Sequence, residues 1–192
     1  MLKKQLVATN STIEKIELGE NFTLVACDDN KIYSFGDNSF GQLGREILPD
    51  NPLEILPIHS NFPQNAIPHK ISACGSHAFL IDTQSNIYAW GENINGELGL
   101  GHSRPVGCLV PNNFLPSNKI KDIQSKGIYN VGVLENGSVI LWPYQKMNGK
   151  FLLKPIQIPF PSNVSIASVS CGQNFVMYVC FHFSLLIFLS GC

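Results

Sequence analysis

The stretch that decides the fold is Asn86-Ile87-Tyr88-Ala89-Trp90-Gly91-Glu92-Asn93-Ile94-Asn95-Gly96-Glu97-Leu98-Gly99. It joins a short alternating apolar run to a glycine-rich turn. Nearly the same text occurs earlier, as Lys31-Ile32-Tyr33-Ser34-Phe35-Gly36-Asp37-Asn38-Ser39-Phe40-Gly41-Gln42-Leu43-Gly44. The offset between the aromatic residues Phe35 and Trp90 is the same as that between Gly44 and Gly99, the final glycines of the two turns. A fixed period of this size indicates a repeat architecture.

Each copy of the turn is the end of a predicted β-hairpin. Phe22, His77 and Tyr129 lie at one constant spacing before Phe35, Trp90 and Trp142. The intervening segments are apolar, rich in β-formers and broken by turn residues, which is typical of antiparallel strands. The third hairpin carries Asn136-Gly137, the strongest short hairpin signal. A fourth unit begins within residues 166–180. Constant hairpins with variable connections predict the blades of a β-propeller.

Four glycines are expected to end the first strand of each unit, at Gly19, Gly75, Gly127 and Gly172. Five prolines fall within residues 45–70, a density that excludes a helix interior or a central strand. We therefore expect a long surface connection there, with one edge strand around Leu53–Ile58.

The G-x-N-x-x-G-x-L-G turn has two alternative interpretations. Glycine and asparagine tolerate a positive φ, so this segment can turn the chain sharply, and we expect Leu43 and Leu98 to plug inward between blades. A glycine-rich loop can also bind phosphate. The loop here lacks G-x-x-x-x-G-K-[S/T], and no helical pattern follows it, so no helix dipole is available. We therefore interpret the turn as structural.

These residues resemble the regulator of chromosome condensation repeat family. The residues that we assign to the structural repeat motif are Gly19, Phe35, Gly36, Asn38, Gly41, Leu43, Gly44, Gly75, His77, Trp90, Gly91, Asn93, Gly96, Leu98, Gly99, Gly127, Trp142 and Gly172. The resemblance implies a seven-bladed β-propeller in full-length members. The third unit departs from the pattern, because Trp142-Pro143-Tyr144 replaces the turn.

The expected fold is therefore all-β: a partial propeller of about three blades of four antiparallel strands, forming the open arc of a truncated member. Within residues 1–180 we expect repeats over residues 15–69, 70–119, 120–165 and, in part, 166–180. The exposed blade edges would invite pairing with another chain.

Residues 181–192 are expected to form a non-repeat apolar tail. The preferred interpretation is an alternative end of a shortened repeat. A β-strand with an apolar extension and a membrane tail anchor stay open. A bilayer span needs roughly 20 apolar residues. The apolar run over residues 175–189 is shorter than that, and His182 and Ser184 interrupt it.

No catalytic constellation is visible in the sequence. His77 stands where the other units have an aromatic residue, so it predicts packing between blades. The adjacent acids Asp28 and Asp29 would point apart on a strand, which disfavours general acid–base catalysis. The six cysteines form no C-x-x-C pair. We expect no enzyme activity, no cofactor and no metal.

Function is then expected on the surface, as protein recognition. The chain carries a net charge of −1 with scattered Lys and Arg, which predicts no direct nucleic-acid binding. The resemblance implies a protein-interaction scaffold or, alternatively, a guanine-nucleotide exchange factor for a small GTPase. Without a signal-peptide pattern, we expect a cytoplasmic or nuclear location with reduced thiols.

Overall fold

The computed structural model describes residues 11–45, 55–58, 66–114, 120–127, 129–142, 146–147, 150–151, 153–160, 164–172, 175–180 and 186–190. The side chains of residues 146–147, 150–151, 175 and 186–190 lie outside that description. The regular elements within these ranges are β-strands, and the described residues contain no helix. Residues 143–145 of the divergent third unit and most of the connection over residues 46–65 lie outside the described residues.

Apart from one separate two-stranded hairpin, the described strands form four successive antiparallel sheets, which we call blades 1 to 4. Blade 1 has β1 (Ile13–Leu18), β2 (Phe22–Cys27), β3 (Ile32–Gly36) and β4 (Leu56–Pro57), and blade 2 has β5 (Pro68–Cys74), β6 (His77–Asp82), β7 (Ile87–Gly91) and β8 (Val106–Pro111). Blade 3 has β9 (Ile120–Lys126), β10 (Tyr129–Leu134), β11 (Val139–Leu141) and β14 (Ile156–Ile158), with the hairpin β12 (Lys146–Met147) and β13 (Lys150–Phe151) inserted. Blade 4 has β15 (Ile166–Cys171), β16 (Phe175–Cys180) and β17 (Leu186–Ser190). The edge strand expected around Leu53–Ile58 is present as β4.

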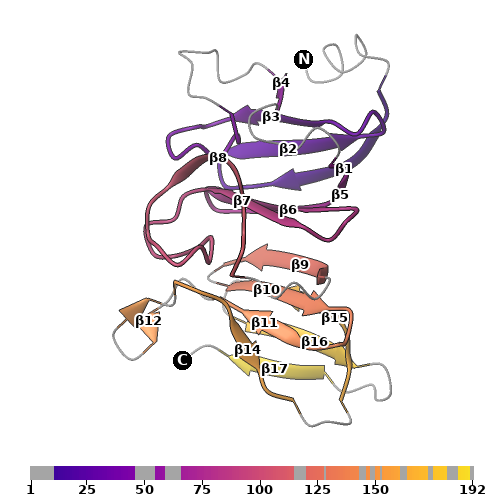
Figure 1. Cartoon of the computed structure of the whole chain (residues 1–192), viewed down its shortest axis with the longest axis vertical. Helices are drawn as coiled ribbons and strands as arrows, with labels where there is room; N and C mark the ends of the chain where they lie inside the picture. Colours follow the sequence, from indigo (N-terminus) through magenta and orange to yellow (C-terminus); the bar gives the residue numbers. More distant parts are fainter. Residues whose placement is uncertain are drawn as a thin grey trace.

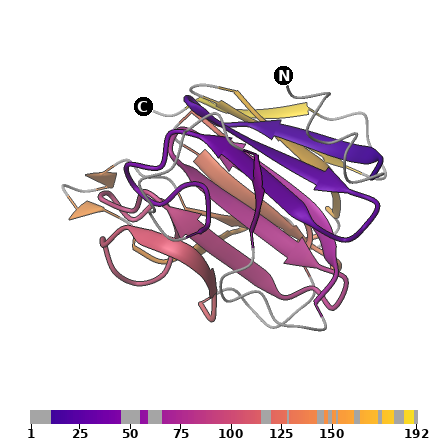
Figure 2. The same cartoon turned by 90° about the horizontal axis from the view of Figure 1, so that it is seen from above.

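The blades follow one another along the long axis of the molecule, with blade 1 at one end and blade 4 at the other (Figure 1). Figure 2 looks along that axis and shows the sheets overlapping. The first strand of each blade contacts the first strand of the next, so β1, β5, β9 and β15 lie side by side in that order. This arrangement is the expected open arc of a propeller.

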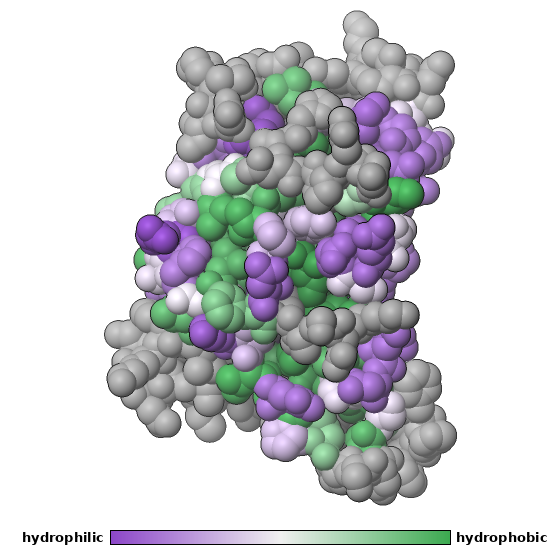
Figure 3. Space-filling model, in the orientation of Figure 1, coloured by the Kyte–Doolittle hydropathy of each residue, from purple (hydrophilic) through white to green (hydrophobic). Residues whose placement is uncertain are grey.

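Apolar cores fill the seams between consecutive blades. Leu24 and Ile32 of blade 1 pack with Leu80, Tyr88 and Trp90 of blade 2. A second cluster joins blade 2 to blade 3, and a third joins blade 3 to blade 4. Blades 2 and 3 therefore bury one face against the blade before and the other against the blade after. On the face that Figure 3 shows, hydrophobic residues form a broken band along the long axis, between hydrophilic ones.

The first-strand glycines are not all equivalent, which corrects the sequence-based alignment. Leu18 pairs with Thr23, as Ala73 pairs with Ala78, so Gly19 corresponds to Cys74 and not to Gly75. Gly75 and Gly127 have positive φ values of 53° and 59° in the turns between the first two strands of their blades. Gly19 is needed for space instead, because a Cβ there would meet the Phe22 ring and the Gly75 carbonyl oxygen. Gly172 follows Cys171, which pairs with Val176, and so shares the Gly19 position.

Part of the tail forms the β-strand that was one of the open alternatives. Residues 186–190 form β17, which pairs antiparallel with β16 in the way that β3 pairs with β2. Leu189 lies opposite Val176, the position that Phe35 and Trp90 hold in blades 1 and 2. This part of the tail therefore takes a repeat position, because an apolar run is compatible with the third strand of a blade. The domain boundaries themselves stay a prediction.

Candidate interaction site: the glycine corners and the seams

Two glycine corners, residues 36–44 and 91–99, have the same backbone hydrogen bonds. In the first, the Gly41 amide donates to the Asn38 carbonyl oxygen and the Gly44 amide donates to that of Gly41. In the second, Gly96 donates to Asn93 and Gly99 donates to Gly96. The turn that the sequence predicts is therefore present twice, with one hydrogen-bond pattern.

The asparagine of each corner fixes the leucine that follows it. Asn38 Oδ1 accepts from the Leu43 amide at 2.9 Å, and Asn93 Oδ1 accepts from the Leu98 amide at 2.9 Å. Both leucines are buried in the seam to the next blade. The prediction that they plug inward between blades is confirmed. The asparagines therefore have a structural role, as short acceptors that close a turn.

A tryptophan from the next blade closes each corner from outside. Trp90 Nε1 donates to the Gln42 carbonyl oxygen at 2.9 Å, and Trp142 Nε1 donates to the Glu97 carbonyl oxygen at 3.0 Å. Both indoles are fully buried. We call this contact the tryptophan latch. It joins blade 1 to blade 2 and blade 2 to blade 3. It accounts for the tryptophan near the end of the third strand in blades 2 and 3.

The two corners differ in the polar side chains that cover them. In the first corner, Gln42 Nε2 donates to Asp37 Oδ2 at 2.8 Å, and Asp37 Oδ1 accepts from the hydroxyl and the amide of Ser39. In the second corner, the equivalent pair is Glu92 and Glu97, two carboxyl groups. The buried Glu97 side chain accepts instead from the backbone and side-chain nitrogens of Asn95.

The polar pairs shift the pKa of the first acid in each corner in opposite directions, downward for Asp37 and upward for Glu92. Hydrogen bonds from Ser39, with a further one from Gln42, hold the pKa of Asp37 below its usual value despite partial burial. Burial raises the pKa of Glu92, and the charges of Glu97 and Glu20 raise it further, against a hydrogen bond from Ser76. A proton on Glu92 relieves a repulsion that the first corner does not have.

His77 lies in the seam between blades 2 and 3, as predicted. Its side chain is buried, and Nε2 lies 2.9 Å from Asn130 Oδ1 on β10. Asn130 Nδ2 in turn donates to the carbonyl oxygens of Glu97 and Trp142. Burial lowers the pKa of His77, so the neutral imidazole is favoured. The histidine is therefore part of a chain of hydrogen bonds that also holds the latched carbonyl of the second corner.

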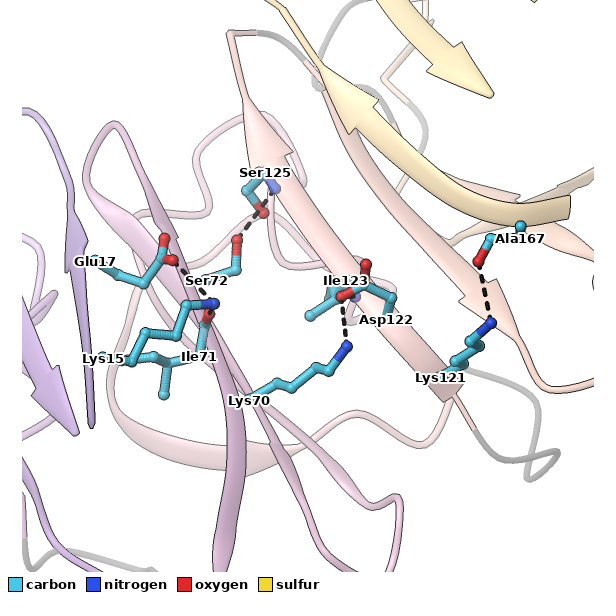
Figure 4. A network of polar contacts seen from close by, with 10 residues as sticks. All are labelled: Lys15, Glu17, Lys70, Ile71, Ser72, Lys121, Asp122, Ile123, Ser125 and Ala167. Atoms are coloured by element: carbon cyan, nitrogen blue, oxygen red, sulfur yellow. Dashed lines mark hydrogen bonds and ion pairs between the residues drawn. The ribbon is translucent and has the colours of Figure 1, made fainter. Parts of the chain in front are cut away.

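Lysines on the first strands cross the same seams (Figure 4). Lys15 Nζ donates to the Ile71 carbonyl oxygen at 3.2 Å, and Lys121 Nζ donates to the Ala167 carbonyl oxygen at 3.1 Å. Lys70 Nζ forms an ion pair with Asp122 at 3.0 Å. Each lysine reaches the next blade, so all three are engaged within the arc and do not form a free basic surface.

The corners and the neighbouring turns share one rim of the arc. The Asp37 amide donates to the Asn21 carbonyl oxygen, and the Glu92 amide donates to the Ser76 carbonyl oxygen. We call residues 19–21, 36–44, 75–76 and 91–99 the corner rim. These segments contain four acidic residues and no lysine or arginine. Ile94 is an exposed apolar residue among them.

The predicted motif residues thus separate into corners, latches and seam contacts, and none of them gathers into a reaction site. Within the described ranges, no group of three or more His, Cys, Asp or Glu side chains is placed to hold a metal ion. The part of the chain that the structure describes also includes no helix long and apolar enough to cross a membrane.

Sequence reasoning missed Asn130 and the three lysines. An asparagine inside an apolar strand segment such as Tyr129–Leu134 is a signal that the sequence does offer. Asn130 is fully buried in the structure, and a buried amide needs hydrogen-bond partners. Lys15-Ile16 and Lys70-Ile71 also repeat at the same offset as the corners. The latch itself has no local signal, because its donor and acceptor lie 48 positions apart in one corner and 45 in the other.

Successive antiparallel sheets, locked by glycine corners and buried indoles, define a partial β-propeller. The family model for the regulator of chromosome condensation (RCC1) repeat matches the chain twice, over residues 13–42 and 84–125. The first match spans β1 to β3 and most of the first corner, and the second spans β7, the second corner and β8. The chain therefore carries RCC1-type repeats.

Comparisons with individual proteins agree with this assignment. The chain is 33% identical over 95 residues to the ultraviolet-B receptor UVR8 of Arabidopsis thaliana, covering 50% of this chain and 21% of the receptor. It is 26% identical over 147 residues to the guanine nucleotide exchange factor SRM1 of Saccharomyces cerevisiae, covering 69% of this chain and 30% of SRM1. The crystal structure of Prp20p from the same yeast, described with its binding to Gsp1p and histones, matches with a TM-score of 0.72 and 22% identity, covering 86% of this chain and 43% of Prp20p. The chain therefore spans less than half the length of these proteins. It is an RCC1-type interaction or regulator module.

Proposed function

We propose that this chain is a protein-interaction module without catalysis of its own, and that the corner rim is its docking surface. The observation that carries the proposal is that each corner combines structural residues with exposed ones. The backbone and the asparagine close the turn and the leucine enters the seam, while the side chains at some variable positions reach the surface. Ser39 and Ile94 occupy the same corner position, and both are exposed.

The charge of the corner rim indicates the kind of surface that it fits. Glu20 is exposed, and Asp37 and Glu92 are half-buried, with no lysine or arginine in the rim segments to neutralise them. An apolar side chain, Ile94, stands among them. A partner surface with lysine or arginine around an apolar contact would complement this arrangement, and charges at the edge of an interface act mainly on the association rate.

A charge reversal on the corner rim tests the proposal. Partners are captured from cell extract by the chain and identified by mass spectrometry, and their affinity is then measured with purified components. We expect Glu20→Lys to reduce the association rate of such a partner, more strongly at low salt than at high salt. Asp28→Lys, an exposed change of equal charge in the β2–β3 turn, is the matched control. Equal effects of the two variants, or no captured partner, would contradict the proposal.

The second candidate is a regulator of a small GTPase. Its support is the activity of SRM1 as a guanine nucleotide exchange factor and the binding of Prp20p to Gsp1p. A likeness of fold does not transfer an activity by itself. Release of a fluorescent guanine nucleotide from a panel of small GTPases, with Gsp1p included, tests it directly. Acceleration by this chain would favour this candidate over the scaffold, and a flat panel would remove it.

A further inference from the structure

The seam between blades 3 and 4 is fastened at a different rim from the other two seams. Leu189 holds the tryptophan position of blade 4, and a leucine side chain has no N–H group to donate, so it cannot form a tryptophan latch. At the opposite rim, the Ile166 amide of β15 donates to the Gly137 carbonyl oxygen at 3.2 Å. The β10–β11 turn therefore joins blade 3 to blade 4.

This turn has the same backbone hydrogen bonds in blades 1, 2 and 3, with a different residue at its left-handed position. Asn30, Ser85 and Gly137 hold that position, with φ values of 60°, 65° and 78°. At Gly137, a Cβ would collide with the Ser165 hydroxyl and would lie 3.1 Å from the Ile166 nitrogen. The contact with blade 4 therefore requires glycine, the residue without a Cβ.

The residue before this glycine suits the turn. Asn136 is exposed, and its Oδ1 accepts from the Ser138 amide at 3.0 Å. Asp29 has the same role in blade 1, where its Oδ1 accepts from the Lys31 amide at 3.1 Å. Short side chains with an acceptor oxygen are favoured for this bond. Turn chemistry and seam packing together thus place an asparagine directly before a glycine in blade 3.

An asparagine followed by glycine can react with its own backbone. The Gly137 nitrogen attacks Cγ of Asn136, so that a new N–Cγ bond closes a ring and the Cγ–Nδ2 bond breaks. The amide proton of Gly137 passes through solvent to the departing nitrogen, which leaves as ammonia. Water then opens the cyclic imide at either carbonyl, giving isoaspartate or aspartate without oxidation or reduction. Glycine favours the attack because no side chain obstructs its nitrogen. The Ser138 amide favours it because it stabilises the negative charge that develops on Oδ1.

The second corner contains the same pair, Asn95-Gly96, in a different setting. In both pairs the glycine amide donates to the carbonyl oxygen three residues earlier, so that bond holds back both reactions. The half-buried Asn95 side chain donates from Nδ2 to the Glu97 carboxylate at 2.8 Å. The negative charge of Glu97 opposes the charge that develops on the Asn95 carbonyl oxygen. Asn136 is therefore the more reactive of the two. A third pair, Asn148-Gly149, lies outside the described residues.

We propose that Asn136-Gly137 is a self-modification site, at which the asparagine converts without an enzyme to isoaspartate and aspartate, and that the isoaspartate form loosens the seam between blades 3 and 4. In isoaspartate the main chain runs through the side-chain carbonyl carbon and is longer by one methylene group. The Gly137 carbonyl oxygen then loses its place opposite the Ile166 amide. This seam therefore weakens as the protein ages, whereas the corners and latches of the other two seams stay intact.

Tandem mass spectrometry tests the site on the folded 192-residue chain, incubated in warm, mildly alkaline water enriched in heavy oxygen. We expect the converted fraction to grow about tenfold faster at Asn136 than at Asn95, the effect of one hydrogen bond to the developing charge. In urea, which unfolds the chain, the two rates should become similar, which makes Asn95 an internal control. Equal rates in the folded chain, or no heavy oxygen at Asn136, would overturn the proposal.

Hydrogen exchange of the aged chain tests the effect on the seam. The Ile166 amide should exchange faster after ageing, because its bond to Gly137 is lost. Asn136→Gln is the matched control, since blade 2 has Gln84 at this position and glutamine would have to close a larger, less favourable ring. Asn136→Asp adds the charge without the extra methylene group, and blade 1 has Asp29 there. Aged Asn136→Gln and fresh Asn136→Asp should both keep slow exchange at Ile166. Faster exchange in either variant, or unchanged exchange in the aged chain, would show that isoaspartate does not loosen the seam.

Discussion

The corners over residues 36–44 and 91–99 have the same backbone hydrogen bonds but different polar side chains. Both close on an asparagine, bury a leucine and receive an indole from the next blade. The first is covered by a carboxylate–amide pair, Asp37 with Gln42, and the second by two carboxyl groups, Glu92 with Glu97. The comparison teaches that the fold constrains the glycines, the asparagine and the leucine of the repeat, while the polar pair that covers each corner can change its chemistry even though Gln42 and Glu97 are buried.

The largest expected difference concerns the two asparagines. Asn38→Ala removes the acceptor of the Leu43 amide at a half-buried site. It should cost about 1 kcal/mol of unfolding free energy. Asn93 is fully buried and also donates to the carbonyl oxygens of His102 and Arg104. Asn93→Ala should therefore cost about 3 kcal/mol. Urea unfolding followed by circular dichroism measures both, and equal losses would mean that the extra bonds of the second corner contribute nothing.

The two latches should also differ. Trp90→Phe removes the Nε1 donor to the Gln42 carbonyl oxygen. We expect it to cost about 2 kcal/mol, from the lost bond and the smaller ring. At the other latch, Asn130 still donates to the Glu97 carbonyl oxygen. Trp142→Phe should therefore cost only about 1 kcal/mol.

A double variant checks the reason for that difference. Asn130→Ala/Trp142→Phe removes both donors to one carbonyl oxygen, so it should lose more unfolding free energy than the sum of its single variants. Urea unfolding of the four proteins of this cycle gives the coupling. Strict additivity would contradict a shared acceptor.

A single substitution should convert the chemistry of the second corner into that of the first. Glu97→Gln removes the like charge beside Glu92, so the pKa of Glu92 should fall. Carbon-detected NMR titration of the glutamate side chains measures this directly. Gln42→Glu is the reciprocal variant and should raise the pKa of Asp37. If Glu97→Gln leaves the pKa of Glu92 unmoved, the charge of Glu97 does not contribute to it.

The smallest effects are opposite slopes of stability with pH. Because the pKa of Glu92 is raised on folding, its contribution is present below the unfolded value of 4.5 and is lost as the pH rises through the folded value. Because the pKa of Asp37 is lowered, its contribution is present above 3.8 and is lost as the pH falls through the folded value. The urea midpoints of the unmodified chain, Glu92→Gln and Asp37→Asn, measured across acidic pH, should separate the contributions of the two residues. If the contributions of Glu92 and Asp37 change with pH in the same direction, this prediction is wrong.

How much the sequence predicts depends on how local each feature is. The corners and hairpins are predicted because glycine, asparagine and alternating apolar residues determine them within a few positions. The outer strands β8 and β14 have no comparable pattern, and β17 has an apolar run that fits several structures. The different roles of Gly19 and Gly75 are invisible without the strand register. The latch and the His77–Asn130 contact join segments that only the stacking of blades brings together.

Hydrogen exchange of the two indole N–H groups tests the central claim, that each corner is latched by the next blade, most directly. Trp90 and Trp142 are the two tryptophans of the chain, so two indole signals are expected, assigned by the Trp90→Phe and Trp142→Phe variants. The account predicts that both exchange only when the blades separate, far more slowly than an exposed indole. An indole N–H that exchanges at the rate of a free tryptophan would contradict the latch at that corner.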